Sequence, residues 1–279
     1  MPELPEVEII KRQLSEYLVG HTIEDVEVRE SMVVRGDSRQ IIGAKVAKVL
    51  RRGKGLVIEL DNGYSLSVHL KMTGQIIYRG NSTQDRKLSP KVGELPGKHT
   101  HVIFMLDDGG MLYFNDIRKF GWVYILPSNE AEKIPFFKNL GREPFSDLTF
   151  ESFAVLLKST RSPIKNVLMD QRKIAGVGNI YANDALWKAE IHPFRSANSI
   201  SENEAKKLFE SLLYVLEKGI REGAASENTY VDALGGEGNY QNHFLVYKKS
   251  GKDCVRCGGR ISRFVLGGRG TFVCEECQK

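Results

Sequence analysis

The sequence predicts an α+β protein of several domains: an N-terminal helix with an antiparallel β-sandwich, a helical region, and a C-terminal β-hairpin that binds zinc. Short apolar runs separated by turn signals fill residues 1–128. The apolar spacing becomes helical over residues 129–245, and all four cysteines fall within residues 246–279. At about 100–200 residues per domain, a chain of 279 residues has room for two hydrophobic cores.

The first region is expected to begin with a helix and continue as strands. Apolar residues recur at helical spacing from Leu4 to Leu18, and Pro2 and Glu3 suit a first helical turn. Turn signals such as Asp61-Asn62-Gly63 then separate short apolar runs, which favours an antiparallel sandwich or barrel. Strands are expected at residues 44–50, 56–60, 64–70, 102–106, 111–115 and 122–126, with a mobile loop at 80–98.

The second region is expected to be helical, with a glycine-rich turn inside it. Helices are predicted at residues 150–158, 164–170, 180–188 and 202–222, and a flexible loop at 223–245. The turn Gly176-Val177-Gly178 is not a dinucleotide-binding fingerprint, because Tyr181 stands in place of the third glycine and no strand precedes it. Between two helices, its backbone N–H groups suit a phosphate.

The four cysteines predict a structural zinc site. Cys254, Cys257, Cys274 and Cys277 have the spacing C-x2-C-x16-C-x2-C, which lies within the zinc-ribbon template. Two disulfides are the alternative, but nothing else in the sequence indicates an oxidising compartment. Four thiolate ligands leave a zinc ion no open position, so the expected role is structural.

Charge and composition favour a nucleic-acid partner. The chain carries a net charge of +5, and residues 246–279 alone contain eight Lys and Arg against three Asp and Glu. Such a basic cluster is typical of nucleic-acid binding, although a solvated surface would look the same. No apolar run approaches the about 18 residues of a membrane span. We expect a monomer in the cytoplasm, associated with the nucleoid.

The N-terminus has the groups for amine catalysis. Removal of Met1 is expected because a small residue follows it, and this would leave Pro2 with a free secondary amine. Such an amine can condense with a sugar aldehyde carbon to give a permanently charged iminium ion. The positive end of the following helix disfavours the ammonium form, whereas Glu3 and Glu6 act in the opposite sense and offer carboxylates for proton transfer.

The whole chain resembles the formamidopyrimidine-DNA glycosylase family. The matching blocks follow the family order and are Met1–Glu8, Arg52–Gly55, His69–Gly74, Asp116–Gly121, Gly176–Ala182 and Gly268–Phe272 within the zinc ribbon. The resemblance implies an N-terminal catalytic β-sandwich domain, a helix–two-turn–helix DNA-binding domain and a zinc finger. It also implies a bifunctional base-excision repair enzyme, a glycosylase and AP lyase acting on double-stranded DNA with oxidised purines such as 8-oxoguanine and formamidopyrimidines.

The resemblance assigns roles to individual residues. Pro2 would attack C1′ of the flipped nucleotide with Glu3 as acid, and β- and δ-elimination would follow. Glu6 would position water or relay protons, Lys54 would donate a proton and contact phosphate, and Arg269 would serve the final elimination. Three residues would fill the space left by the flipped base, namely Met72, Arg118 and Phe120. Phosphate contacts would come from His99, Arg161, Lys165, Asn179 and Arg269, with His69 either a further contact or a buried structural residue.

One departure concerns the loop that caps the lesion in this family. Around Ser226–Tyr230 this chain has Asn228 where family members commonly have a basic residue, which leaves the lesion preference open. Two alternative functions remain at this point. One is an endonuclease VIII-type glycosylase for oxidised pyrimidines, and the other is a non-catalytic zinc-ribbon protein that binds DNA.

Overall fold

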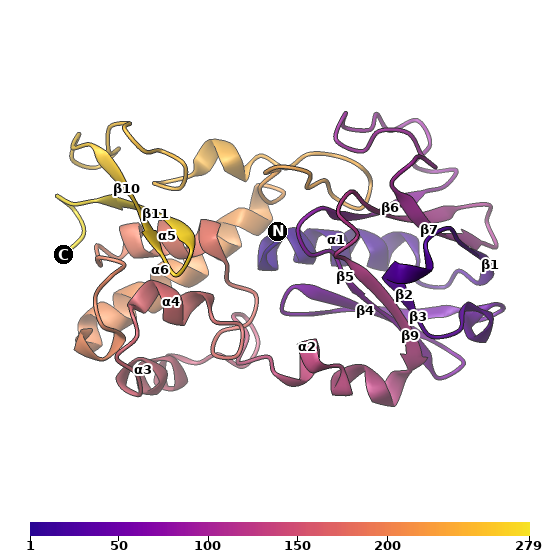
Figure 1. Cartoon of the computed structure of the whole chain (residues 1–279), viewed down its shortest axis with the longest axis horizontal. Coiled ribbons are helices and arrows are strands. Elements are labelled where there is room, and N and C mark those ends of the chain that lie inside the picture. The colour runs from indigo at the N-terminus through magenta and orange to yellow at the C-terminus, as the bar shows by residue number, and fades with distance from the viewer. The chain divides into compact units, whose positions relative to one another are not determined.

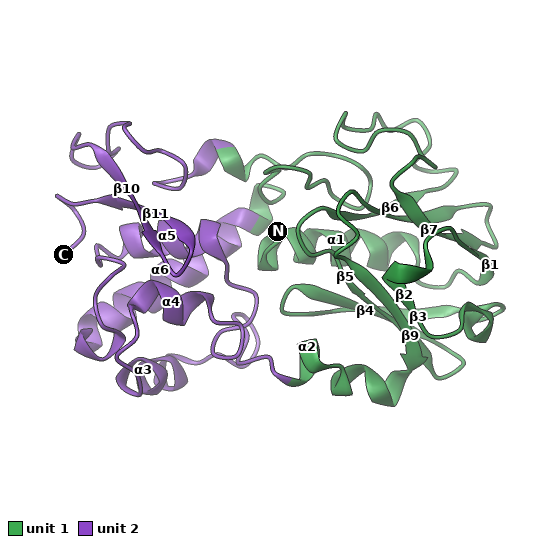
Figure 2. Cartoon of the chain, viewed as in Figure 1, with its two compact units in different colours: residues 1–138, 220–241 green, residues 139–219, 242–279 purple.

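The computed structural model describes residues 1–279 and divides them into two compact units (Figures 1 and 2). Unit 1 comprises residues 1–138 and 220–241, and unit 2 comprises residues 139–219 and 242–279. This division differs from the three consecutive domains predicted. The reason is that residues 220–241 pack with the N-terminal region, while the cysteine-rich hairpin packs on a helix of unit 2.

Unit 1 is a β-sandwich with one long helix. Its four-stranded sheet has the order β1-β7-β8-β6, and its five-stranded sheet has the order β2-β9-β5-β4-β3. Only β2 and β9 pair in parallel. The elements are α1 (Leu4–Tyr17), β1 (Ile23–Val28), β2 (Val34–Arg35), β3 (Val46–Arg52), β4 (Gly55–Leu60), β5 (Tyr64–His69), β6 (Gly74–Arg79), β7 (Thr100–Leu106), β8 (Met111–Asp116), β9 (Trp122–Pro127) and α2 (Pro135–Lys138).

The predicted sandwich is confirmed, and the hairpin turns are where the sequence placed them. Strands β4 and β5 pair across Asp61-Asn62-Gly63, where Gly63 has a φ of 83° that a side chain would strain. Strands β1, β2 and β6 were not predicted. Three carboxylates interrupt any apolar run in β1, and β2 is only two residues long.

One hydrophobic core joins the helix to both sheets. Val7, Ile10 and Leu14 of α1 are buried with residues of the five-stranded sheet such as Val68 and of the four-stranded sheet such as Phe114. Burial of apolar side chains on this scale is the main stabilising contribution to such a unit. The packing fixes α1 against β3, β4 and β6.

Unit 2 consists of helices and one β-hairpin. Its main elements are α3 (Phe150–Lys158), α4 (Ile164–Met169), α5 (Asn179–Lys188), β10 (Ile261–Leu266) and β11 (Arg269–Cys274), with α6 (Glu202–Arg221) ending at the boundary. Helix α5 is almost wholly buried, and β11 packs against it (Figure 1). The four predicted helices and the hairpin are thereby confirmed. None of the helices combines the length and apolar character that a membrane span requires.

Candidate active site and nucleic-acid interface

The N-terminal residues of unit 1 are buried at the start of α1. Pro2 lies before the helix, and Glu3 is its N-cap residue. The backbone N–H of Glu3 donates to Oε2 of Glu6 at 2.8 Å, and the two carboxylates are only 4% and 1% exposed. The structure therefore brings the predicted nucleophile and both predicted carboxylates together in a largely dry place, next to the positive end of a helix.

A chain of contacts connects α1 to the turn that carries Lys54. Nε of Arg51 donates to Oε2 of Glu8 at 2.8 Å, and its Nη1 donates to the carbonyl of Gly53 at 3.1 Å. Burial raises the pKa of Glu8, but Arg51 and Arg12 outweigh this and hold it below its usual value. Lys54 follows in the β3–β4 turn and is buried. The Glu8–Arg51 pair thus sets the position of the Lys54 turn relative to α1.

Glu6 also holds the segment 222–241. Its Oε1 accepts a hydrogen bond from the N–H of Ala225 at 2.9 Å, and its backbone carbonyl accepts one from the hydroxyl of Tyr230 at 3.1 Å. Further along α1, Oε1 of Gln13 accepts from the N–H of Ala233 at 2.8 Å. Burial raises the pKa of Tyr230 well above its usual value, so its hydroxyl stays a donor. The predicted flexible loop is in fact fastened along α1.

The carboxylate of Asp116 organises the loop that carries Arg118 and Phe120. It accepts hydrogen bonds from the hydroxyl of Thr73, from the N–H of Arg118 at 3.1 Å and from the N–H of Gly121 at 2.6 Å. The N–H of Arg118 also donates to the hydroxyl of Thr73 at 3.1 Å. One side chain therefore ties the loop after β8 to the turn before β6.

This tie brings the three predicted gap-filling residues onto neighbouring turns. Met72 precedes Thr73 and is half-buried, whereas Phe120 is 56% exposed. The guanidinium of Arg118 lies over the ring of Phe120, 4.6 Å from its centroid. Ile117 in the same loop is also exposed and was not singled out from the sequence. Its position as an aliphatic residue beside the Arg118–Phe120 pair could have indicated Ile117 from the sequence.

His69 has the structural role that the sequence left open. It is only 2% exposed, its ring meets Phe136 edge-on at 4.4 Å, and its Nδ1 accepts from the N–H of Lys71 at 2.8 Å. Burial, with the nearby charges of Lys71 and Lys54, lowers the pKa of His69 to about 3. The ring is therefore neutral at physiological pH and positions the Lys71 turn.

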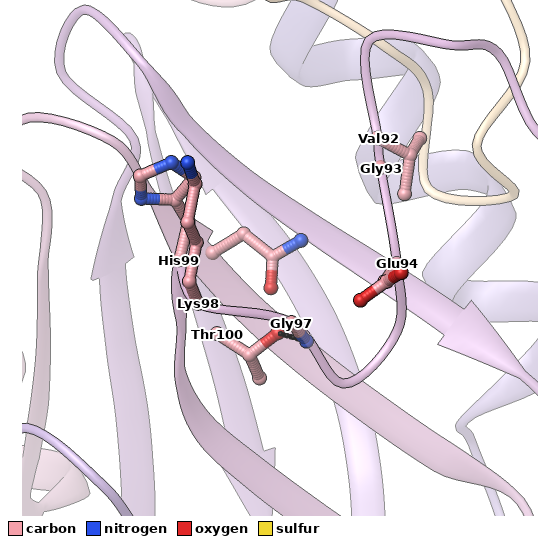
Figure 3. Close-up of a pocket in the computed structure, with 8 residues that line it drawn as sticks. Val92, Gly93, Glu94, Gly97, Lys98, His99 and Thr100 are labelled. Atoms are coloured by element: carbon pink, nitrogen blue, oxygen red, sulfur yellow. Dashed lines mark hydrogen bonds between the residues drawn. The ribbon is translucent and has the colours of Figure 1, made fainter.

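His99 lies at a pocket of about 280 Å³ on unit 1 (Figure 3). Residues 92–100 form most of its lining, with Glu94 and Lys98 among them, and Asn115 of β8 completes it. The side chain of Asn115 is buried, and its Oδ1 accepts no hydrogen bond. The predicted phosphate contact His99 is half-buried at the side of this pocket.

In unit 2, the predicted phosphate-binding turn leads into α5. Gly178 is the N-cap residue, and Gln171 secures the turn by accepting from the N–H of Gly176 at 3.0 Å and donating to the carbonyl of Val177 at 2.7 Å. Nδ2 of Asn179 donates to the carbonyl of Gly270 at 3.1 Å. The turn is thus placed beside the tip of the β10–β11 hairpin, within the same unit.

Lys165 requires a correction, because its ammonium group lies inside unit 2. The residue is 0% exposed, and Nζ donates to the carbonyl of Gly270 at 2.9 Å and to the hydroxyl of Thr271 at 2.8 Å. In this structure it cannot reach a phosphate, and it fixes the hairpin instead. Arg161 and Arg269, the latter next to the turn Gly267-Gly268, are both exposed as predicted.

The four cysteines fit a zinc ion. Their sulfur atoms all lie within 4.8 Å of one another and form no disulfide. The Cys254–Cys277 and Cys257–Cys274 pairs are 3.9 and 3.4 Å apart. A tetrahedral zinc site with bonds of about 2.3 Å places its sulfurs about 3.8 Å apart. Burial opposes ionisation of Cys254, but backbone N–H groups and the indole of Trp187 lower its pKa to about 6.

A buried carboxylate positions the segment that leads to these cysteines. Asp184 of α5 accepts from the N–H groups of Leu245, Val246 and Tyr247 at 3.0 to 3.1 Å. Burial raises the pKa of Asp184 to about 6, against the effect of these hydrogen bonds. The role of Asp184 could not be predicted from the sequence, because its partners lie about 60 residues further along the chain.

Comparison with known proteins identifies the family to which the chain belongs. Residues 1–123 match the formamidopyrimidine-DNA glycosylase N-terminal domain, residues 140–231 its H2TH domain, and residues 251–279 the zinc finger found in FPG and IleRS. The formamidopyrimidine-DNA glycosylase of Pelotomaculum thermopropionicum is 39% identical over 100% of this chain and 99% of its own. The chain belongs to the formamidopyrimidine-DNA glycosylase family. It is a repair glycosylase of this type, with one structural zinc ion held by its four cysteines.

Solved structures of the family agree over the full length. The MutM (Fpg) protein of Thermus thermophilus has a TM-score of 0.87 and 36% identity, covering 99% of this chain and 98% of that chain. A mutant of Lactococcus lactis Fpg in complex with a Fapy-dG-containing DNA has a TM-score of 0.87 at 33% identity and full coverage of both chains. Wild-type Lactococcus lactis Fpg has been solved with DNA containing an oxidised pyrimidine, at a TM-score of 0.86, 33% identity and full coverage of both chains.

Proposed function

We propose that this glycosylase removes oxidised purines, 8-oxoguanine and formamidopyrimidines, from duplex DNA and then cleaves the strand as an AP lyase. The observation that carries the proposal is the N-terminal cluster, in which Pro2 precedes a helix and Glu3 and Glu6 are buried beside it. Family membership supports it, and so does the relative that is solved with Fapy-dG-containing DNA. The protein acts as a monomer on one lesion at a time.

The first chemical step joins the protein to the sugar. The lone pair of the Pro2 nitrogen attacks C1′, and the C1′–N9 bond to the base breaks as Glu3 supplies a proton. The Pro2 nitrogen then gives up its proton to Glu3, the C1′–O4′ bond breaks as Glu3 passes that proton to O4′, and an iminium between Pro2 and C1′ results. The N-terminal end of α1 favours the neutral, nucleophilic amine, because its positive potential disfavours an ammonium. The negative charge of Glu6 has the opposite effect on the amine, but the N–H groups of Glu3 and Ala225 partly compensate it by donating to this carboxylate.

Strand cleavage follows from the iminium as electron sink. Loss of a C2′ proton expels the 3′ phosphate, and a second elimination expels the 5′ phosphate. Water then hydrolyses the iminium and releases the amine of Pro2. Lys54 donates protons and contacts phosphate from the turn fixed by Arg51, and Arg269 assists the last elimination from the hairpin tip.

Binding requires that the duplex tolerate loss of a stacked base. Met72, Arg118 and Phe120 fill the gap, and Asp116 keeps their two turns in a fixed relation. His99, Arg161, Asn179 and Arg269 hold the phosphates, while Lys165 and His69 act from the interior. Oxidised pyrimidines are a second substrate class, because the Lactococcus lactis relative has been solved with such DNA.

Borohydride trapping tests the proposal directly. Reduction of the iminium should give a covalent protein–DNA adduct on an 8-oxoguanine duplex, and peptide mapping should place it on residue 2. Pro2→Gly retains an amine and should trap weakly. A form that keeps Met1 has an amide at Pro2 and should not trap, yet it should still bind DNA. An adduct on Lys54 would contradict the assignment, and no adduct together with tight binding would favour a non-catalytic protein.

Glu3→Gln separates base removal from strand cleavage. Single-turnover excision of 8-oxoguanine should fall by about 10²-fold or more, because the departing base loses its proton donor. Cleavage of a pre-formed abasic site should fall much less, since no base has to leave. Equal losses in both reactions would show that Glu3 serves the enzyme in a different way. Excision rates on purine and pyrimidine lesions in matched duplexes rank the two substrate classes.

A further inference from the structure

The predicted mobile loop 80–98 makes a set of specific contacts with residues 222–241, which we call the capping segment. Both stretches belong to unit 1. Nζ of Lys91 donates to the carbonyl of Ser226 at 2.8 Å and to Oε2 of Glu237 at 2.6 Å. This one ammonium group therefore bridges two points of the capping segment that lie eleven residues apart.

Neighbouring residues strengthen the connection on both sides of Lys91. The N–H of Ser89 donates to the carbonyl of Gly235 at 2.8 Å, and its hydroxyl donates to the carboxylate of Glu237. Lys91 and Ser89 together hold the pKa of Glu237 below its usual value, so the carboxylate is ionised at neutral pH. Glu237 thus has two partners from the same short stretch of chain.

Apolar contacts support the polar ones. Val92 and Val231 are buried in one small cluster with Ile77 of β6, and Leu88 packs against it. A Cβ at Gly235 would lie 2.3 Å from Cδ2 of Leu88, so the two stretches approach as closely as a glycine permits. The contact excludes water from part of the interface and gives the polar bonds a fixed geometry.

Gln75 connects this contact to the part of the capping segment nearest the gap-filling turn. Its Nε2 donates to the carbonyl of Lys91 at 3.1 Å and to the carbonyl of Thr229 at 2.8 Å. Gln75 is buried and lies on β6, three residues after Met72. One buried amide group on β6 therefore links the backbone of Lys91 to that of Thr229 in the capping segment.

We infer that Lys91 is a positioning residue for lesion recognition: with Ser89 and Gln75 it holds the capping segment in the conformation that receives the flipped base. The inference rests on the proposed function, because the segment has a base to cover only during excision. It also offers a substitute for the basic residue that family members commonly have at the position of Asn228. In this chain the organising cation comes from the loop 80–98, outside the capping segment.

The role predicts different effects on the two reactions. An excised base must be held against the capping segment while the bond to C1′ breaks, so a loosened segment slows excision. An abasic site presents no base, so its cleavage does not depend on the same contacts. A residue that merely stabilised the fold, or gripped the DNA backbone, would affect both reactions together.

The experiment compares Lys91→Met, Glu237→Gln and the double variant with the wild-type chain, using Lys87→Met as the matched control. Lys87 is an exposed lysine of the same loop. Single-turnover excision of 8-oxoguanine should slow about 3- to 5-fold in either single variant, as expected for a charged hydrogen bond at a partly exposed site. The double variant should lose less than the product of the two single losses, because the two changes share the Lys91–Glu237 contact. Abasic-site cleavage should stay within about twofold throughout.

Hydrogen exchange on the DNA-free protein supplies a second readout. The amides of residues 226–231 should exchange faster in Lys91→Met and not in Lys87→Met, while those of β4 and β5 stay protected. Unchanged excision in Lys91→Met, or an equal loss of excision and abasic-site cleavage, would overturn the inference. If the wild-type chain excised no base, the proposed function would fail, and the exchange measurement alone would decide whether Lys91 holds the segment.

Discussion

The capping segment of unit 1 and the hairpin tip of unit 2, residues 267–270, are assigned the same task of meeting DNA, yet they are secured in different ways. The capping segment has no strand or helix of regular length, and side chains such as those of Glu6 and Lys91 hold it. The tip is a tight turn between paired strands, fixed from beneath by the buried ammonium of Lys165.

The solvent exposure of the two contacts explains how firmly each region is held. The Lys91 and Glu237 side chains are 28% and 38% exposed, so their ion pair is partly solvated and contributes about 1 kcal/mol or less. Breaking this pair alone therefore costs little, whereas the buried contacts of Glu6 with Ala225 and Tyr230 remain. Lys165 is wholly buried, and losing its contacts would leave a buried carbonyl and hydroxyl without a charged donor. The hairpin tip is thus preformed by a buried cation, whereas the Glu237 end of the capping segment is held by a partly exposed one.

The strongest test of the preformed tip is removal of zinc. Metal binding and folding are coupled in such sites, so chelation should unfold the β10–β11 hairpin and reduce DNA affinity by at least about 100-fold. Exchange protection of the capping segment should be unaffected, since no cysteine belongs to unit 1. Elemental analysis that found well under one zinc per chain in active protein would contradict this expectation.

Substitution of Lys165 should have the next largest effect. Lys165→Met removes the donor to Gly270 and Thr271 and should lower the free energy of unfolding of unit 2 by about 2 kcal/mol. Urea denaturation followed by tryptophan fluorescence, in a Trp122→Phe background that leaves Trp187 as the one tryptophan, measures this. DNA affinity should fall, but its dependence on salt should not change, because the ammonium does not contact phosphate. A smaller salt slope in this variant would show that Lys165 does contact phosphate, as the sequence led us to expect.

Exposed cations of unit 2 should behave in the opposite way. Arg161→Met and Arg269→Met should leave stability within about 0.5 kcal/mol, as for other surface changes. Each should reduce the slope of log affinity against log salt by about 1 unit, because each releases one phosphate contact. Filter binding at several salt concentrations gives the slopes. Unchanged slopes would mean that these side chains face solvent in the complex.

The smallest effect concerns acid and the capping segment. The folded-state pKa of Glu237 is lower than the ordinary value of 4.5, so its pair with Lys91 is complete above pH 4.5 and is lost as the pH falls through the lowered pKa. Protection factors of residues 226–231, corrected for the intrinsic exchange rate, should fall in that window. Glu237→Gln should reduce this pH dependence, and the hairpin tip, whose residues 267–270 include no carboxylate, should lack it.

Patterns that are local in sequence predicted most of the fold. The strands next to Asp61-Asn62-Gly63 and the cysteine hairpin follow from turn chemistry and ligand spacing, which involve neighbouring residues. Burial of Lys165 could not be predicted in this way. In a sequence it resembles any surface cation on a short helix, and its partners Gly270 and Thr271 lie more than one hundred residues away.

The candidate site shows the same limit. Pro2, Glu3 and the gap-filling residues were identified because they belong to compact blocks of sequence. Gln75 and Lys91 were missed because each acts on a segment that is brought near only by folding. The polar loop 80–98 read as mobile, since nothing in its composition indicates that it meets the capping segment.

The discontinuity of unit 1 has a consequence for synthesis of the chain. Glu6 finds its partner Ala225 219 residues later, so unit 1 cannot close around the N-terminus until that stretch has left the ribosome. At about 5–20 residues per second, roughly 10 to 45 s pass between emergence of the first residue and that point. During this interval the terminus is unshielded, and an aminopeptidase can remove Met1 before Pro2 becomes buried. The late arrival of the capping segment thereby leaves time for exposure of the Pro2 amine, the proposed nucleophile.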